Sequence, residues 1–172
     1  MDDGRPTAPL SAVAFALGCV LTEGEPYDSP RALAQAGPRA AVLLHRAADE
    51  VLTGLPNTSK IPAGVAETVA GYVELARTFE PTDARYLLNH RGHLLFVKPE
   101  ERRFVTADLI RETTFTATEA ALTDRIAALR AAGYTQFTVQ LVPGQEAAIE
   151  DWGRIDAERS ADGAARCRVV RP

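Results

Sequence analysis

The chain has 172 residues, of which 46% are hydrophobic and 24% charged, with a formal net charge of -4 and a pI near 5.4. This length suffices for one domain with a hydrophobic core, and the composition is that of an ordinary globular protein. The weakly acidic balance argues against nucleic acid as a partner, because nucleic-acid-binding proteins present a basic surface. The two cysteines, Cys19 and Cys167, give no disulfide framework, which favours a reducing, cytoplasmic setting.

A first strand is predicted over residues 12–21, within the one long apolar run at residues 10–21. Large side chains at odd positions alternate with small ones at even positions, which suits a barrel strand. We expect the large ones under a helix layer and the small ones in the interior, although the faces could be reversed. The run is too short to span a membrane. Residues 16–19 loosely resemble a lipoprotein cleavage box, so export with Cys19 as the lipid-bearing residue is a third hypothesis, behind the two given below.

Helical sequence dominates the next part of the chain. Ser29 and Pro30 predict an N-cap followed by proline at the first helical position, and this short helix is expected to end at Gly37. A second helix is predicted from Pro38 to Gly54, with His45 at its edge. Further helices are predicted over residues 65–79, over residues 82–88 and after residue 106.

Residues 89–93, Asn-His-Arg-Gly-His, form the densest polar cluster of the chain. The spacing of His90 and His93 could bind a metal, but no third ligand is evident, so no metal site is predicted. We expect His90, Arg91 or His93 to line the mouth of a substrate or cofactor site, or to transfer a proton. The alternative is a capping and hydrogen-bonding cluster at a helix end. Residues 94–97 are expected to be buried, and residues 99–103 exposed.

Residues 114–155 predict a strand, a helix, a second strand and a second helix, which is a βαβ unit with parallel strands. The strands are expected over residues 114–116 and 136–142. The helix between them has a buried stripe and a glycine suited to its C-terminal end, and the last helix has an apolar face: Leu122, Ile126 and Leu129, then Gly133, then Ile149, Trp152 and Ile155. Residues 156–172 lack periodicity and are predicted to be a disordered tail, which leaves residues 1–155 as a single domain.

The segments NHRGHLLFVKPEERRFVTADLI and TFTATEAALTDRIAALRAAGYTQFTVQLVPGQEAAIEDWGRI resemble the C-terminal part of the bacterial luciferase-like superfamily. The relevant branch contains flavin- and deazaflavin-dependent oxidoreductases similar to methylenetetrahydromethanopterin reductase. The resemblance covers about residues 12–155 and depends on the order of the segments. It implies an α/β fold, a partial (β/α)8 TIM barrel with about its last three strands. These would be residues 12–21, 114–116 and 136–142, with a largely helical insertion between the first two.

The resemblance also implies a cofactor, either FMN or the deazaflavin coenzyme F-420, and a small-molecule substrate. Phosphate sites in such barrels often follow the seventh and eighth strands, so Thr116, Ala117 and Thr118 are the predicted cofactor-binding residues. The family pattern usually has glycine where this chain has Ala117. Alternatively, Thr118 is only an N-cap, or Thr116 and Glu119 form a capping box. Gln140 on the last strand is expected to point toward a ligand in the barrel, or alternatively to satisfy only buried backbone groups.

The first hypothesis is therefore a flavin- or deazaflavin-dependent oxidoreductase of the monooxygenase or reductase type. Three strands cannot close an eight-stranded barrel, so catalysis would require a complementing N-terminal half-chain or a homodimer. The second hypothesis is a non-catalytic remnant, or a self-associating interaction module of the same fold.

Overall fold

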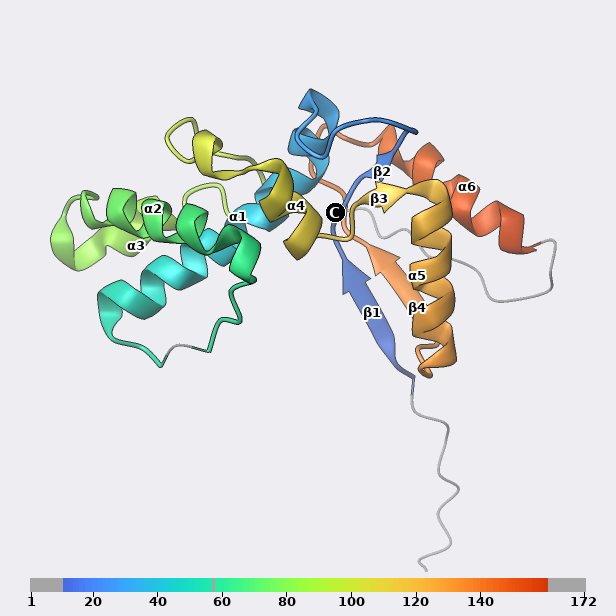
Figure 1. Ribbon diagram of the computed structural model, residues 1–172, viewed down its shortest axis with the longest axis horizontal. Helices are drawn as coiled ribbons and strands as arrows, with labels where there is room; N and C mark the ends of the chain where they lie inside the picture. The colour runs from blue at the N-terminus through green and yellow to red at the C-terminus, as the bar shows by residue number, and fades with distance from the viewer. Residues whose placement is uncertain (1–10, 57, 161–172) are drawn as a thin grey trace, which may run out of the picture.

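The computed structural model describes residues 11–56 and 58–160. Helices α1 to α4 gather on one side of the molecule, and the strands with α5 and α6 lie on the other (Figure 1). Among the described residues, three short 3-10 helices, η1 to η3, occur in the helical part. In chain order the elements are β1 (Val13–Ala16), β2 (Val20–Leu21), α1 (Pro30–Thr53), η1 (Ala63–Val65), α2 (Ala66–Arg77), η2 (Thr82–Ala84), α3 (Arg85–Asn89), η3 (Arg102–Phe104), α4 (Ala107–Thr113), β3 (Ala117–Thr118), α5 (Glu119–Ala131), β4 (Gln136–Val139) and α6 (Ala148–Ser160).

The strand pairs are parallel, β1 with β4 and β2 with β3. The carbonyls of Ala12 and Ala16 accept hydrogen bonds from residues 135, 136 and 140, at the two ends of β4. The carbonyls of Leu17 and Cys19 accept from residues 115 and 117. Successive carbonyls of a strand point to opposite edges, so the stretch that contains β1 and β2 lies between β4 and β3.

The predicted strand over residues 12–21 is interrupted at residues 17–19, which separate β1 from β2. Gly18 lies at this interruption, where a Cβ atom would be 2.1 Å from the carbonyl oxygen of Phe115. Only a residue without a side chain fits so close to a neighbouring backbone. Gly18 therefore allows the stretch that leads into β3 to run alongside the first strand.

The two faces of β1 are the reverse of the favoured prediction. Ala14 and Ala16 lie beside Phe137 and Val139, on the face that α5 and α6 cover. Val13 and Phe15 lie on the opposite face and are 48% and 62% exposed. No helix among the described residues covers that second face, which is why its large side chains remain in solvent.

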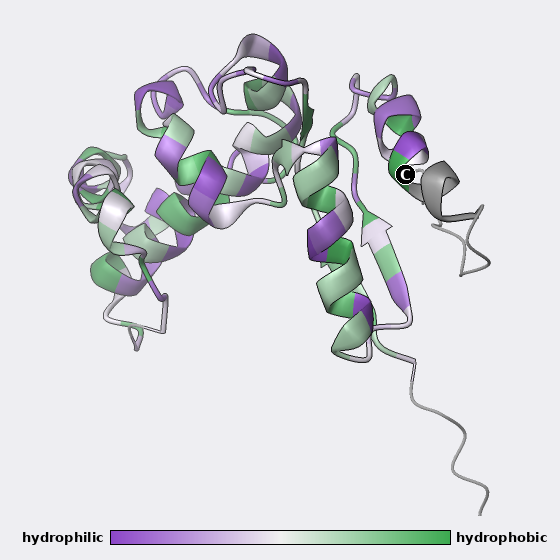
Figure 2. Cartoon of the chain, turned by 45° about the vertical axis from the view of Figure 1, so that its right-hand side comes forward, coloured by the Kyte–Doolittle hydropathy of each residue, from purple (hydrophilic) through white to green (hydrophobic). Residues whose placement is uncertain are grey.

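The helices of the βαβ unit follow the sequence pattern. Leu122 and Ile126 of α5 and Trp152 of α6 are buried in one cluster with Val139, and Gly133 follows α5 with a φ of 95°. Figure 2 shows hydrophobic residues recurring along α5, in front of the strands in that view. The strands are shorter or displaced: β4 ends at residue 139, and β3 begins at residue 117. The reason for the displacement is that Thr114 is the C-cap of α4, with its N–H bonded to Ile110.

The predicted helix break at Gly37 is wrong, because α1 runs unbroken from Pro30 to Thr53 through Pro38. Ser29 caps its start and Gly54, with a φ of 70°, follows its end, as predicted. Proline inside a helix costs about 3 kcal/mol. Buried residues on both sides of Pro38 offset that cost: Leu33, Ala36, Ala40, Ala41 and Leu44.

The segment after α3 also differs from the prediction. Leu95 and Phe96, expected to be buried, are 51% and 49% exposed, whereas Lys98 and Glu101 are completely buried. The reason is that these two charged side chains pair with each other inside the helical part. The predicted burial is therefore wrong for Leu95 and Phe96. The predicted exposure of residues 99–103 is wrong for Glu101, whereas Pro99, Arg102 and Arg103 are exposed as expected.

The fold is mixed α/β with small parallel sheets, and the described residues form no closed barrel. Consecutive barrel strands pair in chain order, which would place residues 114–118 between the other two strands. Here the first strand occupies that middle position.

Helix α6 continues past the predicted end at Ile155 to Ser160, and residues 161–172 of the predicted tail lie outside the described residues. Within the described ranges, no helix combines the length and apolar character needed to cross a membrane.

Candidate functional site

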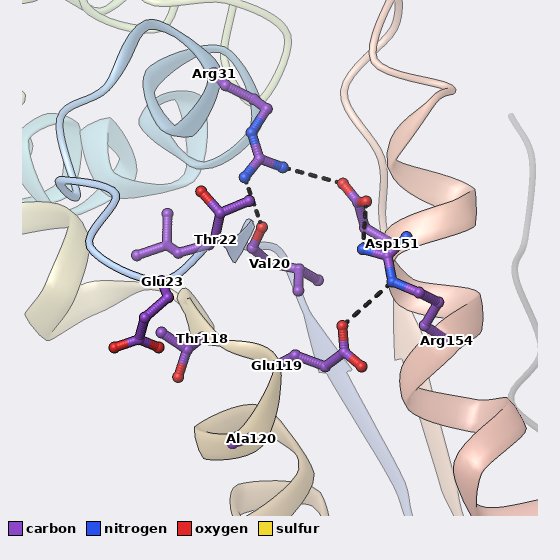
Figure 3. A pocket seen from close by; sticks show the side chains of 10 residues that line it. Val20, Thr22, Glu23, Arg31, Thr118, Glu119, Ala120, Asp151 and Arg154 are labelled. Atoms are coloured by element: carbon purple, nitrogen blue, oxygen red, sulfur yellow. Dashed lines mark hydrogen bonds and ion pairs between the residues drawn. The ribbon is translucent and has the colours of Figure 1, made fainter.

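A pocket of about 330 Å³ opens where β2 and β3 end and α5 begins (Figure 3). The carboxyl ends of parallel strands are the usual ligand-binding edge of open α/β sheets. The pocket lies next to the loop that the sequence predicts as a cofactor site. Its lining residues are Val20, Leu21, Thr22, Glu23, Arg31, Thr118, Glu119, Ala120, Asp151 and Arg154.

Two arginines and their carboxylates form a chain of ion pairs across this pocket (Figure 3). Asp151 joins them, with one oxygen 3.0 Å from Nη1 of Arg31 and the other 2.8 Å from Nη2 of Arg154. Arg154 also pairs with Glu119 at 3.3 Å, and Arg31 with Glu25. A phosphate in this pocket therefore competes with carboxylates for both guanidinium groups.

Glu25 holds Arg31 in place. Burial raises the pKa of the Glu25 carboxyl, but hydrogen bonds from Arg31, Ser29 and Thr22 outweigh burial and lower it to about 2. Glu25 is consequently ionised at neutral pH and orients Arg31 toward the pocket.

The three predicted cofactor residues have different positions. Thr116 is fully buried, and its hydroxyl accepts a hydrogen bond from the backbone N–H of Cys19 at 3.1 Å. Ala117 is 2% exposed and does not line the pocket. Thr118 lines it as the N-cap of α5, but its side chain makes no capping hydrogen bond. The capping box is not formed, because Thr116 bonds to Cys19 and Glu119 pairs with Arg154.

A second polar cluster contains all three histidines of the chain. His45 projects from α1, His90 caps the C-terminal end of α3, and His93 lies in the following turn. Nδ1 of His93 is 3.3 Å from Nδ1 of His45 and 3.3 Å from Nδ1 of His90. His45 is 2% exposed, so the predicted place at a helix edge is wrong: α1 turns this side chain into the interior.

The outer nitrogens of two histidines face carboxylates. Nε2 of His45 lies 2.9 Å from Glu101, and Nε2 of His90 lies 2.6 Å from Asp49. An ionised carboxylate only accepts hydrogen bonds, so we assign the proton to each Nε2, which leaves a lone pair on each Nδ1. Burial lowers the pKa of His45 even though Glu101 opposes this shift, and burial with the neighbouring His45 and His90 lowers the pKa of His93.

Glu101 belongs to a buried network beneath the histidines. It pairs at 2.8 Å with Lys98, whose ammonium also donates to the carbonyls of Asn89 at 2.6 Å and Leu88 at 3.1 Å. Burial raises the pKa of Glu101, but hydrogen bonds from His45 and Lys98 outweigh it and hold the pKa below its usual value. Glu101 is therefore a fixed negative charge against His45.

Of the four residues predicted at the mouth of the site, the structure brings His90 and His93 together. Arg91 and Gln140 are not part of this cluster. Arg91 pairs with Glu100 at 2.9 Å and is half exposed. Gln140 follows β4, where its N–H donates to the carbonyl of Ala16, and it does not line the pocket.

The sequence prediction missed three residues of the cluster: His45, Asp49 and Glu101. A signal was present for two of them, because His45 and Asp49 are one helical turn apart and share a face of α1. Nothing local linked Glu101 to either.

Cys19 is completely buried, and burial raises the pKa of its thiol to about 12. Such a thiol is a poor nucleophile. Cleavage before Cys19 would also remove β1 and its pairing with β4. The described fold therefore gives the lipoprotein hypothesis no support.

Comparison of the chain with protein-family models, with curated proteins and with solved structures finds no match.

Proposed function

We propose that this chain provides the cofactor-phosphate end of a flavin- or deazaflavin-dependent oxidoreductase of the luciferase-like type. The observation that carries the proposal is the pocket at the ends of β2 and β3. It combines the N-terminus of α5 with Arg31 and Arg154, and a helix N-terminus attracts anions through its free N–H groups. In this proposal Thr118 donates its uncommitted hydroxyl to the phosphate, in place of the predicted Thr116 and Ala117.

The cofactor supplies the redox chemistry when bound, and this chain anchors its phosphate end. Catalysis then requires a second chain that completes the sheet. Strands of a parallel sheet are normally covered on both faces, and one face of β1 is uncovered. Val13 and Phe15 lie on the uncovered face of β1. A complementing half-chain or a second copy that covered this face would remove both side chains from water and complete the site around a small-molecule substrate.

The test is titration of the purified chain with reduced FMN and with the reduced deazaflavin coenzyme, followed by fluorescence. The decisive variant is Thr118→Asp, because aspartate is a good N-cap and preserves α5 while its charge repels phosphate. The matched control is Ala66→Asp, which adds the same charge at the start of α2. We expect saturable binding that Thr118→Asp weakens about 10-fold or more and Ala66→Asp leaves unchanged, a difference of about 1.4 kcal/mol. Absence of saturable binding to either cofactor would rule out the proposal.

A second candidate is the non-catalytic, self-associating module, which the open face of β1 favours. It predicts a dimer that binds neither cofactor. Size-exclusion chromatography with light scattering, with and without cofactor, separates the two: a cofactor-dependent change supports the enzyme, and a cofactor-independent dimer supports the module.

A further inference from the structure

We propose that His45, His90 and His93 form a binding site for a divalent transition metal ion, with Zn²⁺ as the best fit. The ligand atoms of the three side chains all lie within 4.8 Å of one another. Zinc holds imidazole nitrogens at about 2.0–2.1 Å in a tetrahedron, which separates two ligand nitrogens by about 3.3 Å. The Nδ1 atom of His93 has that separation from Nδ1 of both other histidines.

Hydrogen bonds alone leave this cluster unsatisfied. The Nδ1 atoms of His45 and His90 both present lone pairs, because their protons are on the nitrogens that face Glu101 and Asp49. His93 has at most one proton on its Nδ1 and so can satisfy only one of the two contacts. A cation at the centre of the three lone pairs satisfies all of them at once.

Lys98 does not change this assignment. Its ammonium is 3.4 Å from Nε2 of His45, but its three protons are taken by Glu101, Leu88 and Asn89, which lie at 2.6–3.1 Å. Nε2 of His45 therefore remains a donor to Glu101, and its Nδ1 remains available to a metal.

The carboxylates match the arrangement around zinc-binding histidines, whose second nitrogen usually donates to a carboxylate that fixes the ring. Glu101 does this for His45, and Asp49 for His90. Asp49 is itself held by the side-chain amide of Asn89, at 2.8 Å. The rings are thus oriented before any metal binds, which reduces the entropy cost of binding.

The charges near the cluster permit a cation. Arg39 and Lys98 act on His93 as positive neighbours, and Asp49 and Glu101 offset them with two negative charges. Among the described residues, the histidine group includes no fourth His, Cys, Asp or Glu ligand. The fourth position is then left for water or an exchangeable anion, as in zinc sites with three protein ligands.

The experiment is calorimetric titration of the chelator-treated, full-length chain with Zn²⁺, and a parallel titration with Co²⁺ followed by visible absorption. We expect one ion per chain and the intense visible bands of tetrahedral Co²⁺. His90→Ala and His93→Ala are the main variants, because neither side chain is fully buried and each replacement should preserve the fold. Each should lower the affinity by roughly 100-fold or more, and Asp49→Asn by about 10- to 100-fold.

Glu74→Gln is the control, because it removes a carboxylate that is 71% exposed on α2 and should leave Zn²⁺ affinity unchanged. Circular dichroism of each variant establishes that it is folded. The proposal is overturned by the absence of saturable Zn²⁺ binding to the folded wild-type chain. It is equally overturned if folded His90→Ala and His93→Ala bind Zn²⁺ as the wild type does. Neither outcome depends on flavin or deazaflavin, so the metal site and the cofactor pocket are tested independently of each other.

Discussion

The Nδ1 atoms of His45 and His93 lie 3.3 Å apart, although 48 positions separate the two residues in the chain. Two things hold them there: α1 carries His45 into the interior, and the buried pair of Lys98 and Glu101 anchors the segment after α3 against it. The cluster is therefore connected to the helical core through His45 and Glu101.

Replacement of Lys98 by Met should strongly destabilise the fold. It leaves the Glu101 carboxylate buried without its ammonium partner, and breaking such a pair typically costs about 3–5 kcal/mol. Urea unfolding measures the change. Lys60→Met is the control, because Lys60 is exposed, and its effect should be within about 0.5 kcal/mol. Equal effects of the two variants would contradict the importance of the buried pair.

Asp151→Asn should strengthen phosphate binding at the pocket. Asp151 pairs with both Arg31 and Arg154, so a neutral amide there removes one carboxylate that competes with phosphate for each guanidinium group. We expect the affinity for FMN to rise about 3- to 10-fold, within the range of roughly 1 kcal/mol for charge-assisted contacts of this kind. Glu146→Gln is the matched control, on the neighbouring loop and outside the pocket. An unchanged or weaker affinity for FMN in Asp151→Asn would place the phosphate elsewhere.

Glu25 should make the stability of the fold depend on acid pH. Its pKa is lowered to about 2 from the ordinary value of 4.5, so the folded state holds the ionised form more strongly than the unfolded chain does. The contribution of ionised Glu25 to the free energy of unfolding is complete above about pH 4.5 and is lost as the pH falls toward 2. Urea unfolding across that range should show the wild type losing its advantage over Glu25→Gln. A constant difference between the two would show that Glu25 does not titrate with folding.

Gly18→Ala should disrupt the close parallel packing of the first strand against the stretch that leads into β3. The new methyl group would lie 2.1 Å from the carbonyl oxygen of Phe115, so the backbone must move, at a cost of about 3 kcal/mol. Gly64→Ala is the control, because a Cβ there meets nothing within 4 Å. Thermal unfolding of both variants tests this, and a Gly18→Ala chain as stable as the control would refute the close approach.

Phe15→Glu should prevent any association through the open face of β1. Phe15 is 62% exposed there, and a charged side chain opposes burial against a partner. Leu87→Glu changes a residue of similar exposure, 60%, in α3 and should leave association unchanged. Light scattering at several concentrations measures the mass. Association that survives Phe15→Glu would assign the interface to another surface.

Elements with local signals could be predicted from the sequence. The stripe of Leu122 and Ile126, the cap at Ser29 and the glycine at position 133 each depend on neighbours within a few residues, and the structure confirms all three. The N-terminus of α5 also lies beside a pocket, close to the loop that was predicted for the cofactor. Local periodicity and capping chemistry suffice for predictions of this kind.

Three features could not be predicted in this way: the strand order, the continuity of α1 through Pro38, and the cluster of His45 with His90 and His93. Each results from packing between segments far apart in the chain. Burial on both sides of Pro38 outweighs one lost hydrogen bond. The paired charges of Lys98 and Glu101 are stable in the interior because His45, Leu88 and Asn89 complete their hydrogen bonds. A local sequence pattern shows neither energy, because the burial around Pro38 and the contact of Glu101 with His45 both join residues that are far apart in the chain.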